Sequence, residues 1–338
     1  MRMMNSRRIH RGIVAISLLT TLVWSQTIKL GSLAPVNSPW HETMLTLGED
    51  WSEISEGELK IKLYAGGILG DEADMVRKMR IGQLHAAALT IEGLMYIIPE
   101  MDVLRMPMMI QTDEELNHIR DVMSDYFRDI LEERGFILLS WSDAGWAHLF
   151  TNAPVIYPDD LNKTDQIVFI WAGGSGKQGW MDAGYNAVEV SAPDIFMSLQ
   201  TGLITTVTTT PIIALSYQWF PAVPFTLDMK AGPLPGAIII TKKKWNKISG
   251  EFHAPLLKKT AERGLALSKE VVELEIEALR VMQENGLTLI QTPDDARAEW
   301  LELVETHMYP EIFEKEVPKD LYLQVKGILE EFRSKSKD

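Results

Sequence analysis

Short apolar or β-branched runs alternate along the chain with longer stretches in which apolar residues recur at helical spacing. The short runs predict β-strands and the helical spacing predicts amphipathic helices. The predicted strands cover residues 27–33, 59–64, 85–90, 136–141, 167–170, 188–190, 203–207 and 237–241. The predicted helices cover residues 41–55, 113–134 and 193–201, with a further helix that Asp71 caps and that runs to Arg80. This alternation predicts an α/β fold class with mainly parallel sheets and helices on their faces.

Residues 255–285 form the longest amphipathic stretch of the chain. Its apolar stripe consists of Leu257, Ala261, Leu265, Val272, Ile276, Leu279 and Met282. Asn285 and Gly286 follow as a helix stop. About 31 residues at ~1.5 Å each give a helix of roughly 46 Å, which exceeds one small domain, so we expect a spine helix that crosses two domains. Gly264 leaves a second possibility open, in which two helices meet at a break.

Composition and charge narrow the class of protein. A length of 338 residues suggests about two domains. The chain carries 33 basic and 47 acidic residues, a net charge of −14, which argues against nucleic acid as a partner. The absence of cysteine excludes disulfides, thiolate metal sites and cysteine nucleophiles.

The N-terminus has the pattern of a secretory signal peptide. Residues 1–11 contain four arginines and no acid, and residues 12–24 form an apolar run. Val23 and Ser25 place small residues before a cleavage site at Ser25-Gln26, so residues 1–25 are the predicted signal peptide of a periplasmic protein. Without a cysteine the mature protein is not a lipoprotein, and its net charge is −18. An uncleaved anchor or a buried first helix remains the alternative, although about 20 residues are needed to span a bilayer.

No constellation of residues supports catalysis. The histidines show no metal-ligand spacing and the chain has no nucleophile elbow. Residues 173–177 (GGSGK) resemble a phosphate loop, but Trp171 and Gln178 occupy positions where that motif needs Gly and Ser or Thr. The sequence therefore predicts a protein that is not an enzyme and that binds no metal and no cofactor. Tryptophans instead cluster in the middle third, at Trp141, Trp146, Trp171, Trp180 and Trp219.

Several motifs, in a shared order over about 250 residues, resemble one family. They are Pro39-Trp40, residues 55–61 (SEGELKI), 64–71 (YAGGILGD), 80–84 (RIGQL), 158–161 (PDDL), 198–204 (SLQTGLI) and 245–248 (WNKI). The chain resembles the DctP-like solute receptors of tripartite ATP-independent periplasmic (TRAP) transporters. The resemblance implies a two-domain periplasmic binding protein fold with an interdomain cleft and a spine helix. It also implies capture of a solute in that cleft and delivery to a membrane permease.

The resemblance also suggests how the chain divides. Domain I is expected to combine residues 26–149 and 237–280, and domain II residues 150–236 and 281–338. The spine helix, at about residues 255–285, crosses both.

The chain departs from the family where the family binds carboxylates. Val168 stands at the position of an arginine that pairs with the substrate carboxylate, and Ala147 stands at that of a second arginine. Thr209 replaces an asparagine that contacts the ligand. A buried carboxylate without a partner costs several kcal/mol, so we expect a hydrophobic or weakly polar ligand. Two alternatives stay open. In one, Lys177 or Lys230 substitutes for the arginine and an organic acid binds. In the other, the protein is a non-transporting structural or signalling module.

The expected ligand-binding residues follow from this alignment and from the aromatic positions. They are Trp40, Thr90, Trp146, Ala147, Val168, Trp171, Ala192, Phe196, Thr209 and Met229. The lost arginine also makes plausible a variant branch of these receptors, which pairs with a periplasmic tetratricopeptide-repeat protein.

Overall fold

The computed structural model describes residues 25–171 and 176–335. The predicted signal peptide therefore lies outside the described residues, except for Ser25. Within the described part, no helix is long and apolar enough to cross a membrane.

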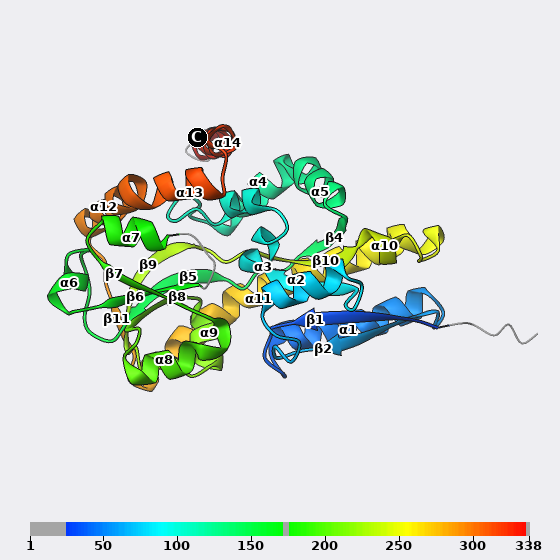
Figure 1. The fold of residues 1–338 in the computed structure, drawn as a ribbon, viewed down its shortest axis with the longest axis horizontal. Helices are drawn as coiled ribbons and strands as arrows, with labels where there is room; N and C mark the ends of the chain where they lie inside the picture. Colours follow the sequence, from blue (N-terminus) through cyan, green and yellow to red (C-terminus); the bar gives the residue numbers. More distant parts are fainter. Residues whose placement is uncertain (1–24, 172–175, 336–338) are drawn as a thin grey trace, which may run out of the picture.

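Two sheets and a strand pair form the framework (Figure 1). The first sheet has the order β2-β1-β3-β10-β4, with β1 at Gln26–Ser32, β2 at Leu59–Tyr64, β3 at Ala86–Thr90, β4 at Phe136–Trp141 and β10 at Gly236–Thr241. The second has the order β11-β9-β5-β8, with β5 at Trp146–Thr151, β8 at Thr206–Thr209, β9 at Phe225–Pro233 and β11 at Thr288–Ile290. Strands β6 (Ile167–Trp171) and β7 (Asn186–Val190) pair in parallel beside them.

The expectation of mainly parallel sheets is wrong. Among the described strands, β1 pairs in parallel with β2 and β3, β9 with β11, and β6 with β7. The pairings of β10 with β3 and β4, and of β5 with β8 and β9, are antiparallel. The reason is the connectivity. Short segments carry the chain from β4 to β5 and from β9 to β10, between the two sheets, so that strands return in the opposite direction.

Helices cover these sheets. Those that precede the crossing at residues 142–145 are α1 (Pro39–Ile54), α2 (Glu72–Arg80), α3 (Ile91–Met95), α4 (Asp113–Val122) and α5 (Ser124–Glu133). Those of the middle part are α6 (Asp160–Lys163), α7 (Lys177–Asp182), α8 (Ile195–Thr201), α9 (Pro211–Ser216) and α10 (Lys242–Trp245). The last are α11 (Gly250–Glu284), α12 (Asp294–Leu303), α13 (Tyr309–Lys315) and α14 (Lys319–Lys335). Short 3₁₀ segments lie at Pro99–Leu104 and Ala192–Asp194, and a π-helical segment lies at Val304–Met308.

The predicted spine helix is confirmed, and it is continuous. Helix α11 has 35 residues, about 52 Å at ~1.5 Å per residue, and extends from the side of β4 and β10 to the side of α9 and β11 (Figure 1). Gly264 does not break it. A Cβ at Gly264 would lie 2.0 Å from Ser140 Oγ and 2.5 Å from the carbonyl oxygen of Trp141, so glycine allows α11 to pack directly on β4.

The single helix expected over residues 113–134 is wrong, because the structure has α4 and α5 there. Met123 separates them with φ −103° and ψ 17°, and its side chain is buried in the core. The turn at Met123 buries this apolar side chain in the core. No glycine or proline marks the turn in the sequence, so the helix break depends on tertiary packing.

The protein has a first lobe built on the β2-β1-β3-β10-β4 sheet and a second lobe built on the β11-β9-β5-β8 sheet (Figure 1). One core joins α1 to a face of the first sheet through Leu47, Trp51 and Ile238. Two others, which include Phe150 and Leu227, lie around the second sheet. Within residues 281–338, Trp300 packs in the second lobe, whereas Val325 of α14 packs in the same core as residues of α4. The domain boundaries expected above stay a prediction.

Candidate functional site

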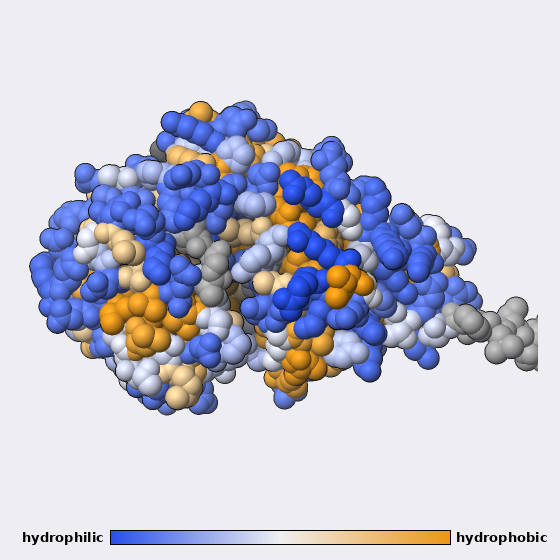
Figure 2. Space-filling model, in the orientation of Figure 1, coloured by the Kyte–Doolittle hydropathy of each residue, from blue (hydrophilic) through white to orange (hydrophobic). Residues whose placement is uncertain are grey.

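A cavity of about 370 Å³ lies between the two lobes. Its first-lobe side is formed by residues 32–35, 88–90, 142 and 144, which lie at or just after the carboxyl ends of β1, β3 and β4. Its second-lobe side is formed by Trp171 at the end of β6, by residues 191–193 after β7, and by α9 and the residues that follow it. Figure 2 shows the recess between the lobes. The carboxyl ends of strands are where open α/β folds bind ligands, and the volume falls in the range of small-molecule sites, about 300–1,000 Å³.

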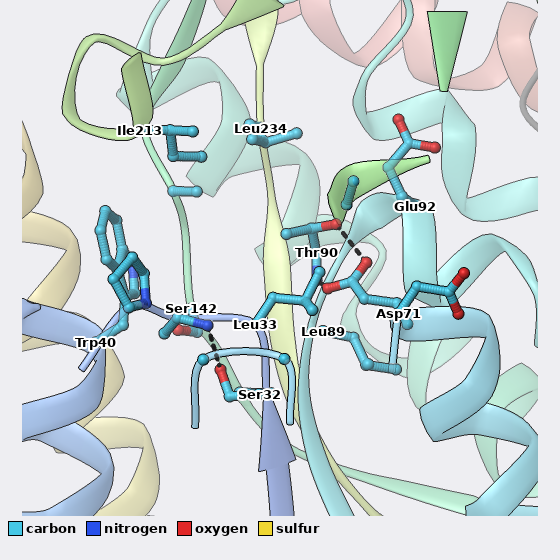
Figure 3. Close-up of a pocket in the computed structure, with 18 of the residues that line it drawn as sticks. Ser32, Leu33, Trp40, Asp71, Leu89, Thr90, Glu92, Ser142, Ile213 and Leu234 are labelled. Carbon is cyan, nitrogen blue, oxygen red and sulfur yellow. Dashed lines mark hydrogen bonds between the residues drawn. The ribbon is translucent and has the colours of Figure 1, made fainter. Parts of the chain in front are cut away.

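Most of the cavity wall is apolar. Trp40 and Ile213 lie on one side, with Leu33, Leu89 and Leu234 nearby (Figure 3). Such a wall gains free energy by removing apolar ligand surface from water, about 25 cal/mol per Å².

The Trp40 side chain is fixed by the segment that crosses between the lobes. Trp40 Nε1 donates to the carbonyl oxygen of Asp143 at 2.8 Å. The Asp143 carboxylate binds Arg120, with 2.9 Å between Oδ2 and Nη1, and accepts a hydrogen bond from Ser268 of α11 at 3.2 Å. Arg120 is 4% exposed, and its guanidinium lies 4.5 Å from the centre of the Trp141 ring. The crossing segment thus joins α1, α4 and α11 and positions one wall of the cavity.

The opposite side of the cavity carries carboxylates. Asp71, Thr90 and Glu92 lie there together (Figure 3), and Glu72 is beside them. Glu72 Oε1 accepts a hydrogen bond from the Thr90 backbone N–H, and Oε2 accepts one from the Thr90 hydroxyl, both at 2.7 Å. Burial, reinforced by the Glu92 charge, raises the pKa of Glu72 to about 7 although the Thr90 hydrogen bonds oppose the shift.

Glu92 has a cationic partner, but that partner is shared. Arg105 binds both Glu92 and Asp102, with 2.8 Å between its guanidinium and Asp102 Oδ1. Burial raises the pKa of Glu92 even though Arg105 opposes it. One guanidinium therefore faces two carboxylates at this side of the site.

Of the described residues that line the cavity, none is lysine, arginine or histidine. Lys230 is exposed, and its Nζ lies 4.5 Å from the centre of the Trp146 ring. Lys177 is also partly exposed, and its Nζ lies 3.4 Å from Glu189 Oε1. Neither lysine lines the cavity, where a substitute cation for a ligand carboxylate would have to be.

The chain matches the model of one protein family over residues 30–316, the bacterial extracellular solute-binding protein family 7 (DctP). The chain belongs to this family. Family 7 proteins are solute-binding proteins, in agreement with the prediction of a solute-binding protein.

Family 7 relatives are distant in sequence. A solute-binding protein of Chromohalobacter salexigens is 27% identical over 51% of this chain and 52% of its own length, so the match spans about half of that relative. The 2,3-diketo-L-gulonate-binding periplasmic protein of Escherichia coli is 22% identical over 84% of this chain and 86% of its own length.

Solved structures of TRAP periplasmic solute-binding proteins share the fold. One from Roseobacter denitrificans, with bound β-D-glucuronate, has a TM-score of 0.81 at 18% identity and covers 90% of this chain and 99% of its own. One from Sulfurospirillum deleyianum, with bound succinate, has a TM-score of 0.80 at 18% identity, with 89% and 98% covered. The predicted fold class, a two-domain α/β periplasmic binding protein with a long helix, is confirmed.

In this family 7 protein, four of the ten expected ligand-binding residues line the cavity: Trp40, Thr90, Trp171 and Ala192. The other six do not line it. Trp146, Val168, Thr209 and Met229 are buried, Ala147 lies on β5, and Phe196 is 44% exposed on α8. Val168 and Met229 pack together in the core of the second lobe, and Thr209 Oγ1 has no hydrogen-bond partner. Whether these ten residues contact a ligand stays a prediction.

The carboxylates of the cavity are not among the residues expected from the sequence to bind a ligand. Asp71 was recognised only as a helix cap, a role it has, since its side chain accepts a hydrogen bond from the Asp74 N–H at 2.8 Å. Glu72 follows it in the first turn of α2, where acids are common because they favour the helix dipole. One signal was available. The pair follows the glycine-rich turn at residues 66–70, close after the carboxyl end of a predicted strand.

Proposed function

We propose that this family 7 protein is the periplasmic solute receptor of a TRAP-type transporter, and that it captures a small, hydrophobic or weakly polar ligand in the cavity between its lobes. Delivery of that ligand to the membrane permease completes the proposed role. The family match and the shared fold support the receptor role. The presence of a cavity of ligand size favours it over a structural or signalling module without a ligand.

The observation that carries the ligand class is the charge of the cavity lining. The relatives named above bind glucuronate, succinate and 2,3-diketo-L-gulonate, which are carboxylates. In this chain the described lining offers carboxylates, apolar side chains and several hydroxyl groups, but no cationic side chain. An anionic ligand would lose its hydration there without gaining a cationic partner, and it would lie near the carboxylates, at a cost of several kcal/mol. This argues against the organic-acid alternative, since Lys177 and Lys230 both lie elsewhere.

Calorimetric titration of the mature protein tests the ligand class. We expect no saturable binding of glucuronate, succinate or sialic acid below millimolar concentration, and saturable binding of the neutral probe 1-hexanol. Micromolar affinity for any of the acids would overturn the proposal.

A periplasmic tetratricopeptide-repeat partner stays a prediction from the sequence. A pull-down with the mature receptor as bait, from an extract of its own host, tests it. Recovery of such a repeat protein supports the prediction, and recovery of the permease alone contradicts it.

A further inference from the structure

One end of the cavity is built around a single buried carboxylate. Glu72 is 5% exposed, and both of its oxygens face Thr90, one toward the backbone N–H and one toward the hydroxyl. These partners are neutral. Within the described residues no lysine, arginine or histidine forms an ion pair with Glu72. A buried carboxylate without a countercharge is costly, and Glu72 lacks the positive partner that would stabilise its charged form.

Other carboxyl groups lie at the same end of the cavity as Glu72. Asp71 and Glu92 also line the cavity, and the Glu92 charge adds to burial in raising the pKa of Glu72. The N-terminus of α2 lies at this end of the cavity, and its dipole favours an anion. Asp71, as the N-cap, and Glu72, in the first turn, already place two carboxylates at that terminus.

The missing positive group is not a metal ion bound by clustered side chains. In residues 25–171 and 176–335, no group of three or more histidines, aspartates or glutamates is arranged to hold one. Most of the rest of the wall is apolar, with Trp40 and Ile213 across the cavity from Asp71 and Thr90 (Figure 3). The site therefore has two parts. One end accepts hydrogen bonds and attracts a cation, and the larger remaining part binds apolar surface.

We infer that the Glu72–Thr90 end of the cavity binds the protonated amine of a ligand whose remaining part is apolar. This inference rests on the proposed function and specifies the polar end of its ligand. An alkylammonium group supplies three N–H donors and one positive charge, which is what the Glu72 carboxylate and the neighbouring Asp71 lack. A hydrogen bond between two charged groups is about twice as strong as a neutral one, so an amine is preferred over a hydroxyl of the same shape.

Three probes of one chain length test the inference: n-hexylamine, 1-hexanol and hexanoate, titrated calorimetrically into the mature protein at about pH 8. We expect hexylammonium to bind roughly tenfold or more tightly than 1-hexanol, and hexanoate to bind more weakly than either. In Glu72→Gln, hexylammonium affinity should fall by roughly tenfold while 1-hexanol affinity changes less than about threefold. The glutamine can keep both Thr90 contacts, because a threonine hydroxyl also accepts hydrogen bonds.

Glu53→Gln, an exposed change on α1 away from the cavity, is the matched control and should leave all three affinities unchanged. Binding of 1-hexanol reports that each variant is folded. Equal affinity for hexylammonium and 1-hexanol, or an unchanged hexylammonium affinity in Glu72→Gln, would overturn the inference and leave the proposed function intact. Binding of hexanoate alone, or of glucuronate, would overturn both.

Discussion

Glu275 of α11 accepts a hydrogen bond of 2.5 Å from the backbone N–H of Trp146, the residue at which the chain enters the second sheet. Gly145, just before it, has φ +101°, and a Cβ there would lie 2.3 Å from Glu275 Oε1. The Trp146 indole N–H donates to Asp113 Oδ1 at 3.1 Å, and Lys230 lies over its ring. The spine helix therefore holds the crossing segment through a buried carboxyl group.

The pH dependence of the free energy of unfolding should reflect the titration of Glu275. Burial raises the pKa of Glu275 to about 7, with the Asp113 charge adding to the shift and the Trp146 hydrogen bond and Lys230 opposing it. A carboxyl whose pKa is raised by folding stabilises the fold fully below its unfolded pKa, and that contribution is lost as the pH rises through the folded value. We expect the Glu275 contribution to the free energy of unfolding to fall by on the order of 2–3 kcal/mol between about pH 4.5 and pH 7.5.

The difference between wild type and Glu275→Gln isolates this effect, because Glu72 titrates in the same direction in both proteins. Urea unfolding at several pH values should show that the free energy of unfolding of the variant, relative to that of wild type, rises by about 2 kcal/mol from pH 5 to pH 8. Glu273→Gln, an exposed change on the same helix, should show no such gain. A pH-independent difference for Glu275→Gln would contradict the account.

The close contact between α11 and β4 predicts that a single methyl group added at Gly264 lowers the stability of the protein. Gly264→Ala should destabilise the protein by about 1–3 kcal/mol, because the added Cβ overlaps Ser140 Oγ and the Trp141 carbonyl. Gly327→Ala is the matched control, since Gly327 is an exposed helical glycine of α14 with no atom within 4 Å of an added Cβ. It should stabilise the protein by up to about 1 kcal/mol through helix propensity. Equal effects at the two glycines in thermal unfolding would show that α11 does not pack this closely.

The ion pair at the crossing segment predicts a strongly coupled pair of mutations. Asp143→Ala leaves the Arg120 guanidinium buried without its countercharge and should cost about 3–5 kcal/mol. The double variant with Arg120→Met should recover a large part of that loss, because no buried charge remains. Asp129→Ala, exposed on α5, should change the free energy of unfolding by less than about 0.5 kcal/mol. Additive losses in the double variant would show that Arg120 and Asp143 do not interact.

Much of the fold follows from local sequence signals. Strands β2 and β4 occupy the expected residues 59–64 and 136–141, and Asp71 caps α2 as expected. Alternation and capping are local properties, so the sequence displays them directly. The break at Met123 and the antiparallel return of β10 depend on tertiary packing and on crossings between lobes, and no local residue signals them.

The cavity was harder to predict for a related reason. Glu72 is significant because β3 brings Thr90 against it and because the fold buries it, and both facts depend on residues distant in the chain. In the sequence alone it is an acid in the first turn of a helix. Val168 and Thr209 were selected by alignment with the family, and the structure places both in the interior rather than along the cavity.

Ligand affinity should depend on pH if Glu72 receives an amine. The pKa of Glu72 is about 7 without ligand, and only its ionised form pairs with an ammonium. Hexylammonium affinity should therefore rise between about pH 6 and pH 8 and level off above, whereas 1-hexanol affinity stays constant. The other titratable groups that face this end are Asp71, Glu92, Tyr96 and Tyr217, of which the tyrosines have pKa values raised above their ordinary value. Loss of the pH dependence in Glu72→Gln checks the assignment, and its persistence contradicts it.

Native mass spectrometry of the mature protein, purified from its own host, tests the central claim most directly. We expect the protein to carry a bound small molecule that is released on activation, and that fragmentation identifies as largely apolar and free of carboxylate groups. A sugar acid, a dicarboxylate or another organic acid released from the cavity would contradict the account.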